Sequence, residues 1–285
     1  MNRLAAGAAV GSTLVLALAA CGSAGKSADS GPGGVKLSAN EVLLKTSQKT
    51  ATVDSFAADV TFDAAGQGRT ATTHFTAQVR LKPDIALTGT VDKANLGGVS
   101  LNASVPVVFL NNVIYVKVPS QLSQFAQFTG NKPWVKFDLS KAGSAHGVDT
   151  LSAVQDGAQL IDPGNLTKSF TGSTDATKVG DETIDGTTTT HYKGTVTVKQ
   201  ALAGLDAQTQ QKLQPLYTKI GSQKIAFDLW ADGQGLARKV NLKAATPKGE
   251  STSLTVVYSS FGKSVSVNAP AASQVGTINL PGAGN

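Results

Sequence analysis

Apolar and polar residues alternate with period two over much of the chain. The clearest case runs from Phe56 to Leu81, where two alternating segments flank the turn Gly66-Gln67-Gly68. Successive side chains of a strand point to opposite faces, so this pattern predicts a hairpin with one apolar and one polar face. Further strands are predicted over residues 85–91, 134–139, 179–184, 187–198, 223–230, 236–242, 251–258 and 264–267, and a further hairpin over residues 105–118. The pairs Asn111-Asn112 and Asp185-Gly186 favour positive φ and predict tight hairpin turns.

Helical spacing interrupts the strands in three places. Ser38 and Glu41 have the spacing of a capping box, which predicts a helix that begins there. A second helix is predicted from a cap at Asp149 to Pro163, followed by a short one through residues 166–170. A fourth helix covers residues 199–220, where Pro215 is expected to split or kink it. Helices between runs of strands are typical of an α+β fold, here one large antiparallel sheet with helices on one face.

The N-terminus has the layout of a secretory signal: a basic start, an apolar run and then small residues before a cysteine. Leu18, Ala19, Ala20 and Cys21 resemble the bacterial lipobox, which predicts cleavage before Cys21. The alternative, a transmembrane helix, needs about 20 apolar residues, and this run is shorter. Cys21 is the only cysteine, and we expect it to carry a diacylglyceryl group. Two acyl chains give stable anchoring, so we expect the protein at the outer face of the cytoplasmic membrane.

The composition divides the chain into four expected segments. Residues 1–20 are the signal peptide, 21–37 the lipidated N-terminus and a flexible linker, 38–275 the α+β domain, and 276–285 a C-terminal tail. The linker is rich in Gly and Ser, and such a segment has a root-mean-square span of roughly 20–24 Å. The folded domain is therefore expected to stay near the membrane.

The formal charge of +6 is mild for 285 residues. It favours an anionic membrane or wall polymer as a neighbour. The basic residues are scattered, without an Arg cluster or interleaved aromatic residues, so we expect no nucleic-acid partner.

Candidate chemistry is sparse. His74 and His191 fall on the polar faces of their strands and are expected to be exposed rather than metal ligands. His146 lies in a glycine-rich segment without a nucleophile elbow. The acidic residues Asp181, Glu182 and Asp185 bracket a hairpin turn, where we expect them to be solvated. We therefore predict no enzyme, no metal and no cofactor, although carboxylates brought together by the fold could still act on wall glycans.

Two Thr-rich strands have similar sequences, Thr-Ala-Thr-Thr-His-Phe over residues 70–75 and Thr-Thr-Thr-Thr-His-Tyr over residues 187–192. Two related halves would explain the similarity, and so would chance.

Several motifs follow one another in an order that resembles a known family. They are Val179–Val196 with its Asp-Gly turn and Thr-Thr-His-Tyr strand, Lys132–Leu139, Asp162–Leu166, Phe227–Val240 and Tyr258–Pro270. Together with the lipobox, they resemble the actinobacterial lipoproteins of the LppX, LprA, LprF and LprG family over nearly the whole chain.

The resemblance implies a fold similar to that of the LolA and LolB carriers. This is a single large curved antiparallel β-sheet, or half-barrel, with helices packed on its concave face. It also implies a hydrophobic cavity that binds acylated lipids or glycolipids and moves them within the envelope, with a membrane transporter as a further candidate partner.

The candidate cavity residues come from strand parity. They are Phe56, Val60, Phe62, Phe75, Val79, Leu87, Phe109, Phe227 and Leu229. The same residues would also describe a close-packed core. A non-transporting envelope scaffold or sensor that binds a protein partner is therefore the alternative function.

Overall fold

The computed structural model describes residues 37–96, 99–101, 103–119, 129–139 and 157–277. All of them belong to one compact unit, Leu37–Asn285. The predicted signal peptide, the lipobox residues Leu18, Ala19 and Ala20, Cys21 and the linker before Leu37 lie outside the described residues, as do Asp149 and His146.

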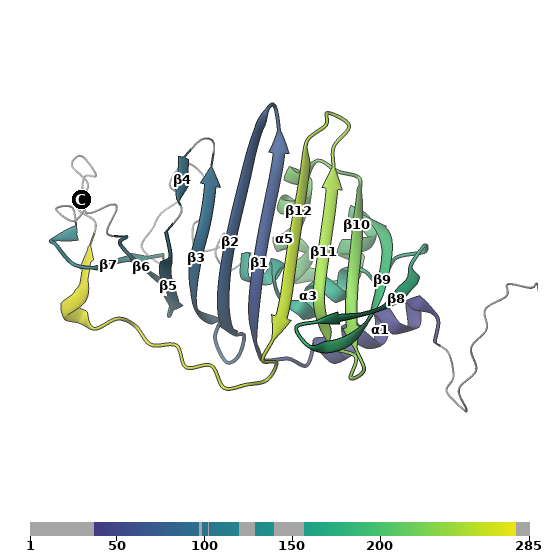
Figure 1. Cartoon of the computed structure of the whole chain (residues 1–285), viewed down its shortest axis with the longest axis horizontal. Coiled ribbons are helices and arrows are strands. Elements are labelled where there is room, and N and C mark those ends of the chain that lie inside the picture. The colour runs from purple at the N-terminus through teal and green to yellow at the C-terminus, as the bar shows by residue number, and fades with distance from the viewer. Residues whose placement is uncertain (1–36, 97–98, 102, 120–128, 140–156, 278–285) are drawn as a thin grey trace, which may run out of the picture. The chain divides into compact units, whose positions relative to one another are not determined.

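Most of the described chain forms one open sheet (Figure 1). Its strands are β1 (Ser55–Gly66), β2 (Arg69–Arg80), β3 (Ala86–Leu96), β4 (Val99–Leu101), β5 (Val105–Leu110), β6 (Val113–Lys117), β7 (Trp134–Asp138), β8 (Thr177–Ile184), β9 (Thr187–Thr197), β10 (Lys224–Asp232), β11 (Ala237–Ala245), β12 (Ser251–Ser259) and β13 (Val275–Thr277). Their order is β13-β7-β6-β5-β3-β2-β1-β12-β11-β10-β9-β8, with β4 beside β3. The prediction of a single large sheet is confirmed.

The pairing of β1 with β12 joins the two halves of the sheet. Ala57 pairs with Ser259 and Ala65 with Ser251, so the strands match along nearly their whole length. Every pairing among the described strands is antiparallel except that of β13 with β7, which is parallel. The sheet is therefore mixed at this edge. The last two residues of β13 fall in the segment expected to be the C-terminal tail.

The tight turns lie where the sequence predicts them. Gln67, Asn111, Asn112 and Asp185 all have positive φ, between 45° and 61°. These residues close the hairpins β1–β2, β5–β6 and β8–β9. Asn and Asp tolerate this conformation better than most residues, so the turn chemistry fixes the strand register.

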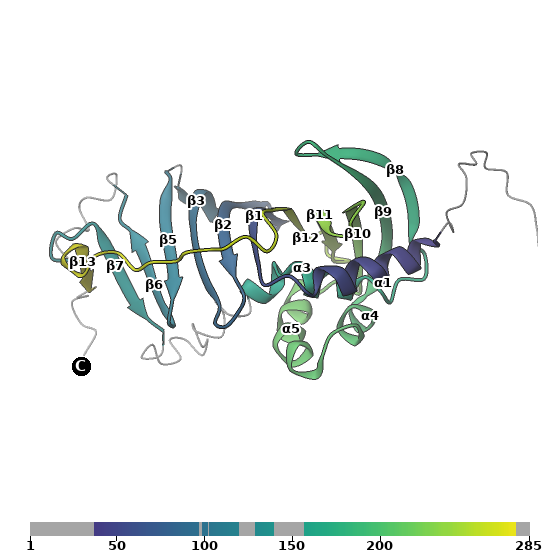
Figure 2. The same ribbon diagram turned by 90° about the horizontal axis from the view of Figure 1, so that it is seen from below.

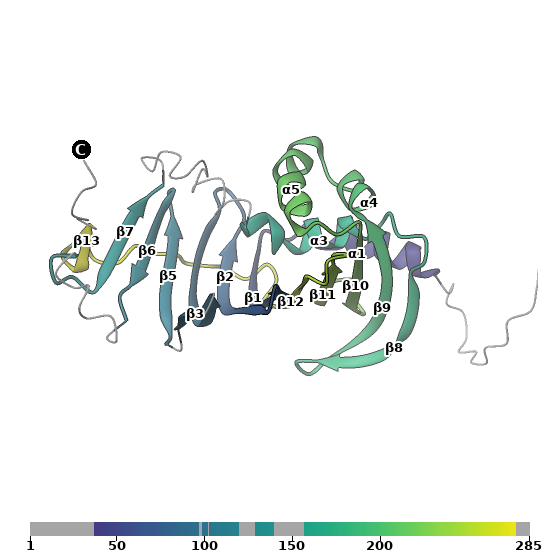
Figure 3. The ribbon, with the colours of Figure 1, turned by 90° about the horizontal axis from the view of Figure 1, so that it is seen from above.

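The described helices lie on one face of the part of the sheet formed by β9–β12 (Figures 2 and 3). They are α1 (Ala39–Thr50), α3 (Pro163–Ser169), α4 (Val198–Ala203) and α5 (Ala207–Ile220), and residues 157–160 are also helical. The capping box of α1 is confirmed: Glu41 N donates to Ser38 Oγ at 3.3 Å, and Ser38 N donates to Glu41 Oε2 at 2.7 Å. The bonds that Ser38 N and Ser38 Oγ donate to the Glu41 carboxylate lower its pKa.

Two helix boundaries and one strand differ from the prediction. Pro163 begins α3, because Asp162 Oδ1 accepts from Gly164 N at 2.7 Å and proline is favoured in a first turn. The helix predicted over residues 199–220 breaks between α4 and α5 rather than at Pro215, because Asp206 caps α5. The strand expected over residues 264–267 is absent from the described chain, where residues 260–271 are irregular.

The main hydrophobic core lies between the sheet and the helices. Phe170 of the α3 C-cap stacks on Phe227 of β10 with ring centroids 4.4 Å apart. Phe56 packs edge-on against Tyr258, and both side chains are fully buried. Tyr258 Oη donates to the carbonyl of Ile161 at 2.9 Å, which ties β12 to the start of α3.

A C-terminal strap, residues 260–274, crosses from β12 to β13 and secures the other half of the sheet (Figure 2). Ser55 Oγ donates to the Lys263 carbonyl at 2.7 Å, and Gly262 N donates to the Ser55 carbonyl at 2.9 Å. Val267 then packs with Ala86 and Val108 in a second, smaller core. The strap therefore covers strands that no described helix reaches.

The break between α4 and α5 depends on Gly204. A Cβ atom at this position would clash with the carbonyl oxygen of Lys168. We expect Gly204→Ala to lower the free energy of unfolding by about 1–3 kcal/mol, the usual cost of overpacking, as measured by urea denaturation. The control is Gly180→Ala in β8, where nothing lies within 4 Å of the added atom and the change should stay within about 0.5 kcal/mol. Equal effects of the two substitutions would contradict this explanation.

Candidate functional site

An apolar cavity of about 550 Å³ lies between the helix-covered face of the sheet and the helices. Its wall comes from six strands, from residues 157–161 and from α5. The lining residues are Val60, Phe62, Phe75, Leu87, Gly157, Ala158, Leu160, Ile161, Tyr217, Ile225, Leu242, Ala244, Thr252, Ser253 and Leu254. Most of them are hydrocarbon side chains, so the cavity suits an apolar ligand.

Strand parity brings these side chains together. Phe62 of β1 lies opposite Leu254 of β12, which lies opposite Leu242 of β11. Residues directly opposite one another in a sheet point to the same face, so the three form one apolar row across adjacent strands. Phe62 keeps 40% of its surface exposed. A large apolar side chain that both lines the cavity and reaches solvent marks the place where the cavity opens.

The opposite wall is built from the helical side. Tyr217 projects from α5, and Ile161 is held by the hydrogen bond from Tyr258. Burial raises the pKa of Tyr217 and, more strongly, that of Tyr258. Both phenols therefore remain neutral at physiological pH and bring no charge to this wall.

The sequence candidates divide between the cavity and the core. Four of the predicted residues, Val60, Phe62, Phe75 and Leu87, line the cavity. The others are almost fully buried away from it: Phe56, Val79, Phe109, Phe227 and Leu229. The main reason is packing, since Phe170 stacks on Phe227 and Tyr258 packs on Phe56, which leaves no space there.

Several lining residues are missing from the sequence candidates. Leu242 and Leu254 have the same parity as the buried Val240 and Val256, so the alternating pattern could have identified them. Tyr217 and residues 157–161 could not be found in this way, because strand parity says nothing of which helix residue faces a sheet.

The other face of the sheet is polar and carries both described histidines. Each ring nitrogen of His191 lies 2.8 Å from a carboxylate oxygen, Nδ1 from Glu182 and Nε2 from Asp228. The His191 ring stacks on Trp230 with centroids 4.2 Å apart, and Lys239 covers the Trp230 ring at 4.6 Å. Only 12% of the His191 side chain is exposed, so the prediction of an exposed histidine is wrong here. Neighbours from β8 and β10, which the sequence of β9 does not reveal, cover it.

His74 has a similar arrangement on the same face. Its Nε2 lies 3.1 Å from Asp59 of β1, and its Nδ1 lies 3.6 Å from Asp92 of β3. In both cases the histidine is on the middle strand of three, with a carboxylate on each neighbouring strand. The two similar Thr-rich sequences thus occupy equivalent positions, which favours related halves over chance.

The described residues contain no group of three or more His, Cys, Asp or Glu side chains that could hold a metal ion. The carboxylate of Asp232 accepts from Gln234 N and Leu236 N at 2.9 Å and from Arg238 Nε at 2.6 Å. This carboxylate therefore shapes the β10–β11 turn. None of the helices in the described part of the chain has the length and hydrophobicity to cross a membrane.

Residues 139–267 match the model of the LppX_LprAFG lipoprotein family. The chain is 32% identical over 151 residues to a 31.2 kDa protein of the rplA–rplJ intergenic region of Streptomyces griseus, over 51% of this chain and 48% of that one. It is 26% identical over 199 residues to SCO4650 of Streptomyces coelicolor, which is named as a lipoprotein, over 66% of this chain and 59% of that one. The chain thus spans about half the length of these curated relatives.

Among solved structures, the fold is similar to that of LprF from Mycobacterium bovis. The TM-score is 0.51 at 14% identity, over 82% of this chain and 97% of LprF. LppX from Mycobacterium tuberculosis matches with a TM-score of 0.47 at 16% identity, over 81% of this chain and 98% of LppX.

The open sheet with its helices on one face defines a LolA-like fold, and residues 139–267 match a family of lipoproteins. The resemblance to the LppX_LprAFG lipoprotein family that the sequence predicts is supported by the family match over residues 139–267 and by the fold of LprF.

The indole of Trp230 lowers the pKa of Glu182. Trp230 Nε1 donates to Glu182 Oε2 at 2.8 Å, and this bond, followed by the contact with His191, lowers the pKa of Glu182. A carboxyl with a lowered folded-state pKa stabilises the fold above its unfolded pKa, near ~4.3, and loses that contribution as the pH falls through the folded pKa. We expect Trp230→Phe to raise the pKa of Glu182 toward its ordinary value, as measured by NMR titration of the carboxyl carbon.

The matched control is Trp134→Phe, which changes the other tryptophan of the chain on the distant strand β7. It should leave the titration of Glu182 unchanged. An unaltered Glu182 titration in Trp230→Phe would show that the indole does not control this carboxylate.

Proposed function

We propose that this protein is a membrane-anchored, extracytoplasmic lipoprotein that binds acylated lipids or glycolipids in the apolar cavity and carries them within the cell envelope. The observation that carries the proposal is the cavity itself. Its volume of about 550 Å³ lies within the range of ~300–1,000 Å³ typical of ligand sites. Its wall can exclude water from hydrocarbon chains, and burial of each CH₂ group favours binding by about 0.8 kcal/mol.

The mechanism is passive binding. Acyl chains leave a membrane, pass the exposed Phe62 and enter the row of apolar residues that Phe62 forms with Leu242 and Leu254. Cys21 carries the lipid anchor after removal of the signal peptide, and the linker keeps the cavity within reach of the membrane. A membrane transporter is a candidate partner for loading or unloading. No covalent chemistry is needed, and the side chains of the cavity supply none.

An envelope scaffold or sensor that binds a protein partner is the alternative. A scaffold needs no ligand space, so its sheet could be fully packed, as it is around Phe56 and Phe227. An unfilled apolar space beside this packed core costs stability. The cavity therefore favours the carrier.

A direct test is native mass spectrometry of residues 22–285 purified from a lipid-rich actinobacterial host. These residues include the compact unit Leu37–Asn285 with both cores, so they should fold without the signal peptide. We expect a co-purifying acylated lipid. Substitution of both Leu242 and Leu254 by Trp should narrow the cavity. If the added side chains cost the complex about 1–3 kcal/mol, as overpacking usually does, the affinity for the lipid should fall roughly five- to 150-fold.

The control is Thr76→Trp, which places the same side chain on an exposed position of the other face, next to the cavity residue Phe75. It should retain the lipid. Far-ultraviolet circular dichroism of each variant separates loss of binding from loss of fold. A protein without bound lipid, unchanged after incubation with envelope lipid extracts, would rule out the carrier and favour the scaffold.

A further inference from the structure

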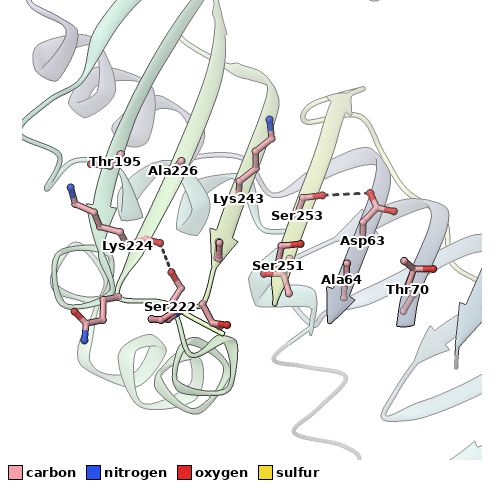
Figure 4. A pocket seen from close by; sticks show the side chains of 18 of the residues that line it. Asp63, Ala64, Thr70, Thr195, Ser222, Lys224, Ala226, Lys243, Ser251 and Ser253 are labelled. Carbon is pink, nitrogen blue, oxygen red and sulfur yellow. Dashed lines mark hydrogen bonds between the residues drawn. The ribbon is translucent and has the colours of Figure 1, made fainter. Parts of the chain in front are cut away.

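A second hollow, of about 920 Å³, lies where the ends of β1, β2, β10, β11 and β12 meet (Figure 4). We call it the polar groove. Its labelled residues are Asp63, Ala64, Thr70, Thr195, Ser222, Lys224, Ala226, Lys243, Ser251 and Ser253. Hydroxyl and amine groups are frequent here, in contrast to the apolar cavity, so the two hollows suit different chemistry.

One row of residues across the sheet forms the base of the polar groove. Thr195 lies opposite Ala226, Ala226 opposite Lys243, Lys243 opposite Ser253, and Ser253 opposite Asp63. These side chains share the polar face, since directly opposite residues point to the same side. The groove thus lies on the face of the sheet that the helices leave uncovered.

The polar groove and the apolar cavity adjoin each other and share lining residues. Ala244, Thr252 and Ser253 line both of them. Ala244, Thr252 and Ala64 lie opposite one another on adjacent strands and point to the cavity side of the sheet. Their side chains are small, so they leave space between the cavity and the rim of the sheet, where β11 ends and β12 begins. An amphiphilic molecule can therefore have its chains in the cavity and its polar part over this rim.

Two lysines give the polar groove its charge. Lys224 begins β10, and Lys243 lies opposite Ala226 on β11, which makes the two lysines diagonal neighbours. Such neighbours are about 7–8 Å apart, so both flexible amines can reach one anion. Both side chains are exposed, and within the described chain neither is part of an ion pair.

The nearby carboxylates are already occupied. Asp63 accepts from Thr72 Oγ1 at 2.8 Å and from Ser253 Oγ at 3.5 Å. Asp175 accepts from Thr195 Oγ1 at 2.6 Å, and this contact with Thr195 lowers the pKa of Asp175. Among the described residues, Lys224 and Lys243 are therefore neighbouring positive charges that form no ion pair with a carboxylate, an arrangement that a bound anion would stabilise.

We propose that the polar groove binds the anionic headgroup of the same lipid whose acyl chains occupy the apolar cavity. The ligand class is an amphiphile with a phosphate or carboxylate on a hydroxyl-bearing headgroup. Lys224 and Lys243 contact the anion, and Ser251 and Ser253 contact the hydroxyl groups. This inference rests on the proposed carrier function and adds the selection of anionic over zwitterionic lipids.

The test uses residues 22–285 and neutral dodecyl maltoside micelles that contain equal amounts of dioleoyl phosphatidylglycerol and dioleoyl phosphatidylcholine. The acyl chains are identical, and the neutral detergent removes attraction to a charged membrane surface. Native mass spectrometry measures the ratio of the two bound lipids. We expect the wild type to prefer phosphatidylglycerol. Replacement of Lys224 and Lys243 by Gln should reduce this preference by about fivefold per lysine.

The control is Lys136→Gln, which removes an exposed lysine on the distant strand β7 and should leave the ratio unchanged. A lower preference in this control as well would assign the effect to net charge and overturn the proposal. Equal binding of both lipids by the wild type would overturn the headgroup site but leave the carrier function intact. Binding of neither lipid would overturn both.

A last arm replaces the lipids by glycerol 3-phosphate, which has the anion but no acyl chains. We expect weak binding at most, because the headgroup is held partly through its chains. Lysine-dependent binding of glycerol 3-phosphate, together with a lipid ratio that does not depend on the lysines, would assign the groove to a free anion and overturn the proposal.

Discussion

The apolar face of the sheet is wider than the described helices can cover, and the rest of the structure follows from this mismatch. Where α3 lies close, Phe170 stacks on Phe227 and the space is filled. Around Phe62, Leu242 and Leu254 the strands continue with the same apolar parity, but no side chain of the described residues fills the space. Uncovered apolar surface is unfavourable in water, so this part of the sheet is suited to a ligand that supplies the missing cover.

The two faces of the sheet thus have separate roles. On the polar face, His191 and Trp230 are held between β8, β9 and β10 by carboxylates and by Lys239, and these cross-strand contacts stabilise that side without a second layer. The apolar face has the core and the cavity. The proposed lipid would extend over both faces of the sheet, with its hydrocarbon chains on one side of the rim and its charged headgroup on the other.

Much of the fold could be predicted from the sequence because its signals are local. The turns at Asn111-Asn112 and Asp185-Gly186 and the cap at Ser38 depend on neighbouring residues alone. The failures have distant causes. Asp162 converts Pro163 from a helix end to a helix start, and Lys168 crowds Gly204 at the break before α5. Phe56 and Phe62 lie on the same strand, β1. Which of them borders the cavity depends on what packs above each part of that strand, and alternation contains no such information.

The pairing of β1 with β12 also has a consequence for how the chain acquires its structure. Ser55, at the start of β1, is bonded to Lys263, 208 positions later. Contacts between such distant segments slow folding, since a long loop must close before they form. Ribosomal synthesis releases β1 long before its central partner exists, so the sheet stays incomplete until the chain is nearly finished. A polypeptide that remains unfolded for this period can still pass through a narrow protein-conducting channel, as its predicted export requires.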